Sequence, residues 1–286
     1  MKFRLIHKTQ YKYAGPVSSY HSLACVMPKS LPQQECSNFS LVISPFPDEI
    51  SQRADYFGNT VHYFSIHKPH TRLTVLAKSL IETRAFTIPE QLITCAEVRE
   101  LLANSLKNKL LEYVLPSPFV YWDDEIRNYA RACFPDDEPL YRCARRLCHK
   151  IYSEFTYVPD FTTIYTPLKT VLKEKKGVCQ DFSHLAIACF RSLGFAARYV
   201  SGYLETQPPP GKPKLQGSDA THAWVSVYVP GMGWCDFDPT NDVVPQERHI
   251  VTAWGRDYGD VPPLKGILFS SGGHEFHVAV DVLPVP

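Results

Sequence analysis

The segment Gly177-Val178-Cys179-Gln180-Asp181-Phe182-Ser183-His184 decides the fold, because it opens the strongest amphipathic helix of the chain. Gly194 follows the helix at the position where a left-handed cap residue is wanted. The pattern predicts a helix with one apolar face and with Cys179 at its start. Its apolar residues recur at helical spacing and are Phe182, Leu185, Ala186, Cys189, Phe190 and Leu193.

The position of Cys179 at a helix start suggests a nucleophile. Unpaired backbone N–H groups and the positive end of the helix dipole favour a thiolate there. A thiolate nucleophile also needs a base to take its proton and an acceptor to orient that base. We expect His222 to be the base and Asp238 to be the acceptor, which makes Cys179, His222 and Asp238 a catalytic triad.

The register of the hairpin that carries His222 and Asp238 tests this triad. Residues 222–229 and 234–238 read as two strands around Pro230-Gly231-Met232-Gly233. If Val229 opposed Trp234, Asp238 would lie on the wrong face for His222. We therefore predict an odd loop or a bulge, which places Asp238 opposite Trp224 and diagonal to His222.

Three other polar residues of the helix compete for roles in the site. His184 lies about 140° around the helix from Cys179, which favours a structural role. Gln180 points about 100° away, which favours packing on the helix surface. Asp181, in the first turn, is explained by the helix dipole.

Outward from this helix, the chain reads as an α+β protein. Residues 1–85 contain short strands separated by turn signals and are expected to form a β-rich N-terminal domain. Residues 86–286 are expected to form one catalytic domain, with a helical part over 95–151 and the Cys-His-Asp core over 152–286. The loop over 208–218 has the composition of a mobile flap.

Composition narrows the class of protein. The 286 residues carry a net charge of +1, which argues against a nucleic-acid partner. No stretch approaches about 18 uninterrupted apolar residues, and the first residues lack the apolar core of a secretory signal. We therefore expect no membrane partner and a cytoplasmic location.

The nine cysteines do not form a recognisable framework. Their number is odd and they are dispersed, so disulfides are not expected. Cys143, Cys148 and His149 come nearest to a zinc motif, but their spacing places the two thiols on different helix faces. No acidic loop resembles a calcium site, and no metal or cofactor is expected.

Four stretches resemble the bacterial transglutaminase-like family, whose members are often described as candidate cysteine proteases. The resemblance covers nearly the whole chain, with residues 1–85 similar to the β-rich N-terminal region of the family. Gly255 to Pro263 resembles its C-terminal segment. The matching stretches are Gly177 to His184, Ala197 to Tyr203, Asp219-Ala220-Thr221-His222-Ala223-Trp224 and Asp236-Phe237-Asp238-Pro239-Thr240-Asn241.

The resemblance implies a papain-like core in which Cys179 attacks an amide and forms a thioester acyl-enzyme. His222 would protonate the departing amine, and water or a second amine would then resolve the thioester. The backbone N–H of Cys179 would stabilise the oxyanion, with Tyr157 as a candidate side-chain donor. The segment from Gly255 to Pro263 is expected beside the cleft, folded back by charge-assisted hydrogen bonds.

Two readings of other classes remain open in the sequence. A non-catalytic domain could keep this fold to bind peptides, and Cys179, His222 and Asp238 could together bind zinc. The expected partner is a protein or peptide amide substrate, whether peptide, isopeptide or glutamine side chain. The sequence does not distinguish hydrolysis from transamidation, and it assigns no oligomeric state.

Overall fold

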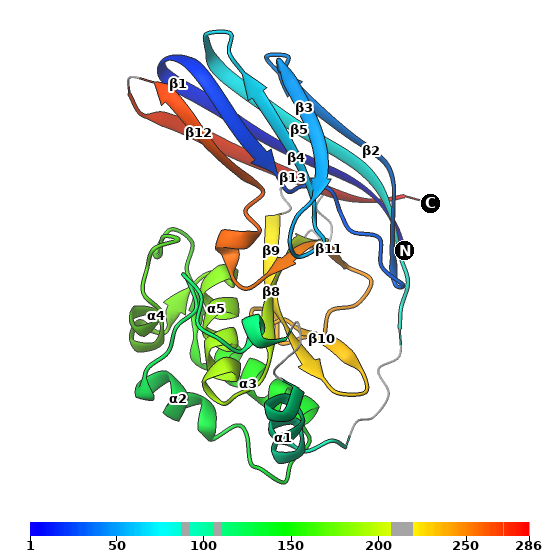
Figure 1. Cartoon of the computed structure of the whole chain (residues 1–286), viewed down its shortest axis with the longest axis vertical. Coiled ribbons are helices and arrows are strands. Elements are labelled where there is room, and N and C mark those ends of the chain that lie inside the picture. The colour runs from blue at the N-terminus through cyan, green and yellow to red at the C-terminus, as the bar shows by residue number, and fades with distance from the viewer. Residues whose placement is uncertain (87–91, 106–109, 207–219, 271, 286) are drawn as a thin grey trace, which may run out of the picture.

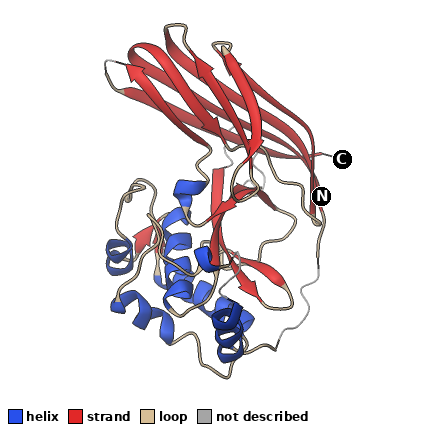
Figure 2. Ribbon diagram, in the orientation of Figure 1, coloured by secondary structure: helices blue, strands red, loops and turns tan. Residues whose placement is uncertain are grey.

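The computed structural model describes residues 1–86, 92–105, 110–206, 220–270 and 272–285. It has two parts, a large β-sheet and a mixed part in which helices lie beside a smaller sheet (Figure 1, Figure 2). The helices are α1 (Cys95–Ser105), η1 (Leu111–Tyr113), α2 (Asp124–Arg131), α3 (Leu140–Glu154), α4 (Leu168–Glu174), α5 (Cys179–Ser192) and η2 (Tyr258–Asp260).

The strands of the large sheet come from both ends of the chain. They are β1 (Lys2–Ala24), β2 (Gln34–Ser44), β3 (Glu49–Ala54), β4 (Thr60–Ile66), β5 (His70–Thr83), β12 (Leu264–Ser270) and β13 (His274–Val285). The mixed part contains β6 (Thr156–Tyr157), β7 (Lys176–Gly177), β8 (Ala197–Leu204), β9 (Ala220–Val229), β10 (Gly233–Phe237) and β11 (His249–Gly255).

The long strand β1 organises the large sheet. Its first half pairs with β5 and β13, and its second half pairs with β4 and β12. The strand order along the sheet is β2-β5-β1-β4-β3, and β12 and β13 pair with β1 off this path. Residues 264–285 therefore belong to the N-terminal sheet, which corrects the expectation that all of 86–286 lies with the catalytic part. The local sequence could not show this, because the pairing joins segments more than 250 residues apart.

The mixed part confirms the predicted α+β class. Its sheet has the order β10-β9-β8-β11, and α5 packs on β9 and β8 (Figure 1). From Asp181 to Arg191 every side chain of α5 is buried, so the helix lies at the centre of the core. The burial extends beyond the apolar face predicted from the sequence and includes the polar side chains of Asp181, Ser183, His184 and Arg191. Cys179, the first residue of the helix, lies at the edge of the core and is only partly buried.

Gly202 allows β8 and β11 to approach each other closely. A Cβ there would lie 2.1 Å from the Ile250 carbonyl oxygen and 2.6 Å from Cη2 of Trp224. We expect Gly202→Ala to lower the free energy of unfolding by about 3 kcal/mol, because a buried backbone and indole cannot both move aside. Chemical denaturation measures this loss. Gly273→Ala is the control, since a Cβ there meets nothing within 4 Å, and an equal effect of both substitutions would contradict the argument.

Candidate active site

The start of α5 is held by a short pair of parallel strands and by its own third residue. β6 and β7 pair parallel, placing Tyr157 beside Gly177, just before the helix. Asp181 Oδ2 accepts hydrogen bonds from the Val178 backbone N–H at 2.8 Å and from the Thr162 hydroxyl at 2.6 Å. A Cβ on Gly177 would lie 2.8 Å from that same carboxylate oxygen. Asp181 is thus a cap that both satisfies the helix start and uses the helix dipole.

The hairpin of β9 and β10 has the register that we predicted. Gly233 pairs with Val229 and Phe237 pairs with Val225, so the loop between the strands is odd. Gly231 and Gly233 both adopt a φ of +85°, which favours glycine. Continuing this register places Asp238 opposite Trp224 and one diagonal step from His222.

The structure brings His222 and Asp238 together. His222 Nε2 donates to Asp238 Oδ2 at 2.7 Å, and both side chains are buried. Cys179 lies close enough to His222 to raise the pKa of the imidazole, and the two side chains line the same cleft. Since Nε2 is occupied by Asp238, Nδ1 is the ring nitrogen that remains for the thiol. The structure therefore brings the three predicted residues together, with Cys179 and His222 in one cleft and His222 hydrogen-bonded to Asp238.

Besides His222, three other residues donate hydrogen bonds to the carboxylate of Asp238. Asn241 Nδ2 donates to its Oδ2 at 2.7 Å and His249 Nε2 donates at 3.1 Å. Its Oδ1 accepts from the Thr240 backbone N–H at 2.9 Å. The buried carboxylate is therefore fully surrounded by donors, which fixes its position and its charge.

The surroundings of His222 and Asp238 favour a protonated imidazole and an ionised carboxylate. Burial alone would lower the pKa of His222, but the hydrogen bonds and charges of Asp238 and Cys179 raise it to about 10. Burial alone would raise the pKa of Asp238, but the hydrogen bonds from His222 and His249 hold it well below its usual range. At neutral pH the imidazole is thus an imidazolium beside the Cys179 thiol.

The same residues could in principle hold a metal. Ligand atoms of His222, Asp238 and His249 lie within 4.8 Å of one another. Both imidazoles already donate to one oxygen of Asp238, so hydrogen bonding explains this grouping without an ion. The predicted zinc alternative had included Cys179, which is not part of the group.

A cleft of about 480 Å³ opens over Cys179 and His222. The mixed part supplies one side, including Tyr157 and Tyr199, whereas β1 and β13 supply the other. The N-terminal sheet thus forms a wall of the cleft rather than a separate module. The residues of that wall are His7, Thr9, Tyr11, Phe276 and Val278.

Of the polar residues of α5 considered above, His184 has the expected structural role, whereas Gln180 does not lie where we expected it. His184 is buried, and its Nε2 accepts from the Tyr258 backbone N–H at 3.1 Å, which confirms a structural role. Burial lowers the pKa of His184 to about 3, so it remains a neutral acceptor. Gln180, which we expected to pack on the helix surface, lines the cleft beside Cys179, because the first two residues of α5 are only partly buried.

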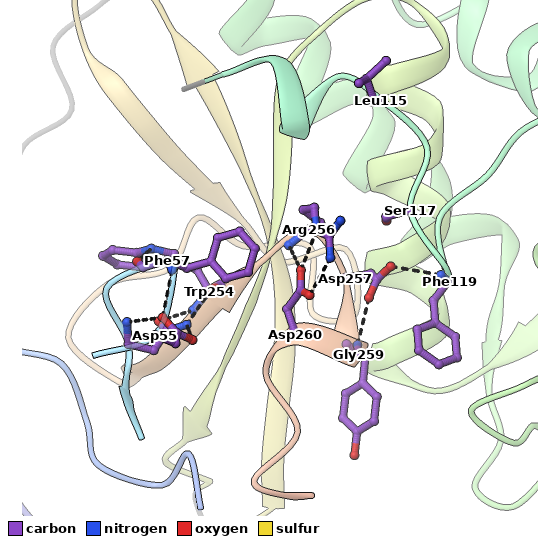
Figure 3. Close-up of polar contacts among 12 residues, drawn as sticks. Asp55, Phe57, Leu115, Ser117, Phe119, Trp254, Arg256, Asp257, Gly259 and Asp260 are labelled. Atoms are coloured by element: carbon purple, nitrogen blue, oxygen red, sulfur yellow. Dashed lines mark hydrogen bonds and ion pairs between the residues drawn. The ribbon is translucent and has the colours of Figure 1, made fainter. Parts of the chain in front are cut away.

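The segment after β11 folds back beside the cleft, as predicted. Arg256 Nε and Nη2 donate to the two oxygens of Asp260, each at 2.9 Å (Figure 3). Asp257 accepts from the backbone N–H groups of Phe119, at 3.0 Å, and Gly259, at 2.8 Å (Figure 3). These bonds hold Tyr258 against the cleft. The predicted flap over 208–218 lies outside the described residues.

Sequence reasoning missed several residues of the site. Asn241 lies only three residues after Asp238, and its side-chain amide, a hydrogen-bond donor, could have indicated that it supports the carboxylate. His249 and the wall from β1 and β13 carried no local signal, because they reach the site only through long-range pairing. Among the residues that the structure describes, no helix combines the length and apolar character needed to cross a membrane.

Comparisons with known proteins agree with this geometry. Residues 3–82 match the bacterial transglutaminase-like N-terminal region, and residues 127–239 match the transglutaminase-like superfamily. An uncharacterized protein of Mycobacterium tuberculosis is 39% identical over 99% of this chain and 93% of its own length. The mouse peptide-N(4)-(N-acetyl-beta-glucosaminyl)asparagine amidase is 25% identical over 46% of this chain and 18% of its own.

A solved structure shares the fold. The crystal structure of a "putative cysteine protease" from Cytophaga hutchinsonii superposes with a TM-score of 0.76 at 23% identity, covering 100% of this chain and 92% of that one. The two family matches, over residues 3–82 and 127–239, agree with the near full-length relative and with this shared fold. The chain therefore belongs to the bacterial transglutaminase-like family.

Proposed function

We propose that this protein is a cysteine-dependent enzyme that cleaves or transfers the acyl group of an amide through a thioester on Cys179. The observation that carries the proposal is that Cys179, at the start of α5, shares one cleft with His222, which is hydrogen-bonded to Asp238. A nucleophile, a base within hydrogen-bond reach and an acceptor that orients the base are the parts that covalent acyl transfer requires.

The reaction proceeds in two balanced steps. The Cys179 thiolate adds to the amide carbonyl carbon, the C–N bond breaks, and His222 gives its proton to the departing amine. The product is a thioester with a neutral His222. A water molecule or a second amine then attacks the thioester while His222 accepts its proton, which restores the thiolate and the imidazolium. Asp238 keeps the imidazole oriented during both transfers.

The substrate class follows from the cleft and the relatives. The wall formed by Tyr11, Phe276 and Val278 offers an apolar surface opposite the nucleophile, which suits a side chain of a protein or peptide. The mouse relative is named as an amidase of a modified asparagine, which is also an amide. We therefore propose a peptide, isopeptide or carboxamide side chain as the bond that is attacked.

An activated ester tests this chemistry without knowledge of the natural substrate. p-Nitrophenyl acetate should acetylate Cys179, and mass spectrometry of the intact and digested protein should find one acetyl group on that residue. Added hydroxylamine or a primary amine should remove it. Cys179→Ser is the matched control, since it keeps the size of the side chain.

Iodoacetamide provides an independent measurement. Of the nine cysteines, Cys179 should be alkylated fastest, because the neighbouring imidazolium stabilises its thiolate. Cys36, which is partly exposed and whose pKa burial raises to about 11, serves as the internal reference. If Cys179 is neither acetylated nor alkylated faster than Cys36, the enzyme proposal fails and a peptide-binding domain is favoured.

Tyr157 is the proposed side-chain donor to the oxyanion. It lines the cleft with Cys179, and burial together with the nearby Cys179 raises its pKa, so it stays protonated. We expect Tyr157→Phe to slow acetylation by roughly 10- to 100-fold, a modest value for such a donor. The initial rate of nitrophenolate release measures this. Alkylation of Cys179 should not change, and an unaltered acetylation rate would remove Tyr157 from the site.

A further inference from the structure

A second cleft, here called the Arg198 cleft, lies away from the catalytic one. Its volume is about 640 Å³, within the range of small-molecule sites. Among the described residues it shares no lining side chain with the catalytic cleft. Its walls come from β8, β10 and β11 and from two segments next to the N-terminal sheet, 31–33 and 84–86.

Arg198 lies in this cleft between two indole rings. Its neighbour on β8, Tyr199, contacts His184 of α5, so Arg198 points from the opposite face of the sheet. Its guanidinium carbon lies 3.9 Å from the ring centre of Trp254 and 4.3 Å from that of Trp234. Trp254 is fixed in turn, because its Nε1 donates to the Phe57 carbonyl at 3.0 Å (Figure 3).

The guanidinium of Arg198 lacks the partners that a buried arginine usually has. The side chain is 8% exposed, and its Nε has no hydrogen-bond partner. No hydrogen bond or ion pair of this guanidinium is found within the described ranges. Arg191, which is 2% exposed, donates instead to the carbonyls of Leu115, Ala197 and Arg256. A buried cation left without such partners is costly unless a ligand supplies them.

Asp236 places a negative charge in the same cleft, near Arg198. Its carboxylate accepts from Trp224 Nε1 at 3.0 Å and interacts electrostatically with Arg198 without forming an ion pair to it. An anion that binds Arg198 therefore lies near a negative charge as well. A ligand that also carries a hydrogen-bond donor or a positive charge satisfies both groups.

We propose that the Arg198 cleft binds a free amino acid with an apolar side chain, whose carboxylate pairs with Arg198 and whose ammonium faces Asp236. The planar guanidinium offers parallel N–H donors that match a carboxylate. The indole of Trp234 and the side chain of Met232 give the apolar part of the ligand a surface. The site is independent of the amide chemistry proposed above.

Tryptophan fluorescence tests this assignment directly, because two of the four tryptophans flank Arg198. The probes are phenylalanine, 3-phenylpropionate, which lacks the ammonium, and phenethylamine, which lacks the carboxylate. Titrations use the full chain with Cys179→Ala, so that no turnover interferes and failure of the enzyme proposal does not affect the result. Phenylalanine should give a saturable change and bind more tightly than the other two.

Two variants assign the binding to the cleft. Arg198→Gln should weaken phenylalanine binding at least about tenfold, with circular dichroism reporting whether it folds. Asp236→Asn keeps an oxygen for Trp224 and should reverse the preference, so that 3-phenylpropionate binds more tightly than phenylalanine. No saturable change up to millimolar ligand overturns the proposal, as does an unchanged preference in Asp236→Asn, which decides the matter even if Arg198→Gln does not fold.

Discussion

Replacing His222 with alanine is expected to lower the rate at which Cys179 is acetylated at neutral pH by about 10³-fold. His222 acts both as the cation that stabilises the thiolate and as the donor of the proton that the leaving amine needs. The raised pKa of His222, about 10, means that the imidazolium is present throughout the neutral range. Nitrophenolate leaves without needing a proton, so the loss in this assay reports the stabilisation of the thiolate, whereas an amide substrate would lose the proton donor as well.

The pH profile distinguishes this role from a structural one. If Cys179 and His222 form the proposed thiolate–imidazolium pair, alkylation of Cys179 in the wild type should be nearly constant between about pH 6 and pH 8, because the pair is then present throughout that interval. In His222→Ala, alkylation should rise steadily with pH over the same interval, as for an ordinary thiol of pKa about 8.5. Iodoacetamide labelling followed by mass spectrometry measures both profiles.

His67→Ala is the control for this experiment. His67 is exposed in the turn between β4 and β5 and does not line the catalytic cleft, so the variant should keep the flat profile. A flat profile in His222→Ala would show that the helix start alone activates Cys179. The base would then have to be assigned to another residue.

The register of the β9–β10 hairpin shows how far the sequence could predict the site. The alternation of residues in 222–229 defined which face His222 occupies, and the requirement that Asp238 reach it left only an odd loop. The structure confirms this loop, with Gly231 and Gly233 in the left-handed region. Local alternation and turn chemistry were therefore sufficient, because His222 and Asp238 are close in sequence.

The wall of the cleft shows where such prediction ends. β13 reaches the site only because it pairs with β1 from Lys2 to Tyr13, and no local pattern in 274–285 specifies that partner. His249 reaches Asp238 because β11 pairs with β8 across an irregular register after Val251. Long-range strand pairing is decided by the packing of the whole sheet, so these residues could be identified only from the structure.

Asp238→Asn should have the largest effect on stability among the triad variants. Removing the charge leaves two buried imidazoles, His222 and His249, without the carboxylate that accepts from both. We expect the free energy of unfolding to fall by about 3 kcal/mol near neutral pH, and acetylation of Cys179 to fall by about 10³-fold. Chemical denaturation and nitrophenolate release measure the two effects.

The stability lost in Asp238→Asn should depend on pH in the way expected for an ion pair of His222 and Asp238. The folded pKa of Asp238 is depressed, so its contribution is present above the unfolded pKa of about 3.9 and is lost as the pH falls further. The folded pKa of His222 is raised to about 10, so its contribution is complete below about pH 6.5 and is lost as the pH rises toward 10. The difference between wild type and Asp238→Asn should therefore be largest between about pH 4 and pH 6.5.

A difference that stays constant from about pH 3 to about pH 10 would contradict the ion pair, because the contributions of Asp238 and His222 are lost toward the two ends of that interval. A steric or purely hydrogen-bonding defect has no reason to titrate. Asn241→Ala separates the two explanations, since Asn241 donates to the same oxygen of Asp238 at 2.7 Å but carries no charge. That variant should lose stability by a smaller amount, about 1 kcal/mol, with little dependence on pH. Such a result would show that the charge of Asp238, and not the number of its hydrogen bonds, makes the stability depend on pH. The same charge keeps His222 protonated, which is the state that the Cys179 thiolate requires.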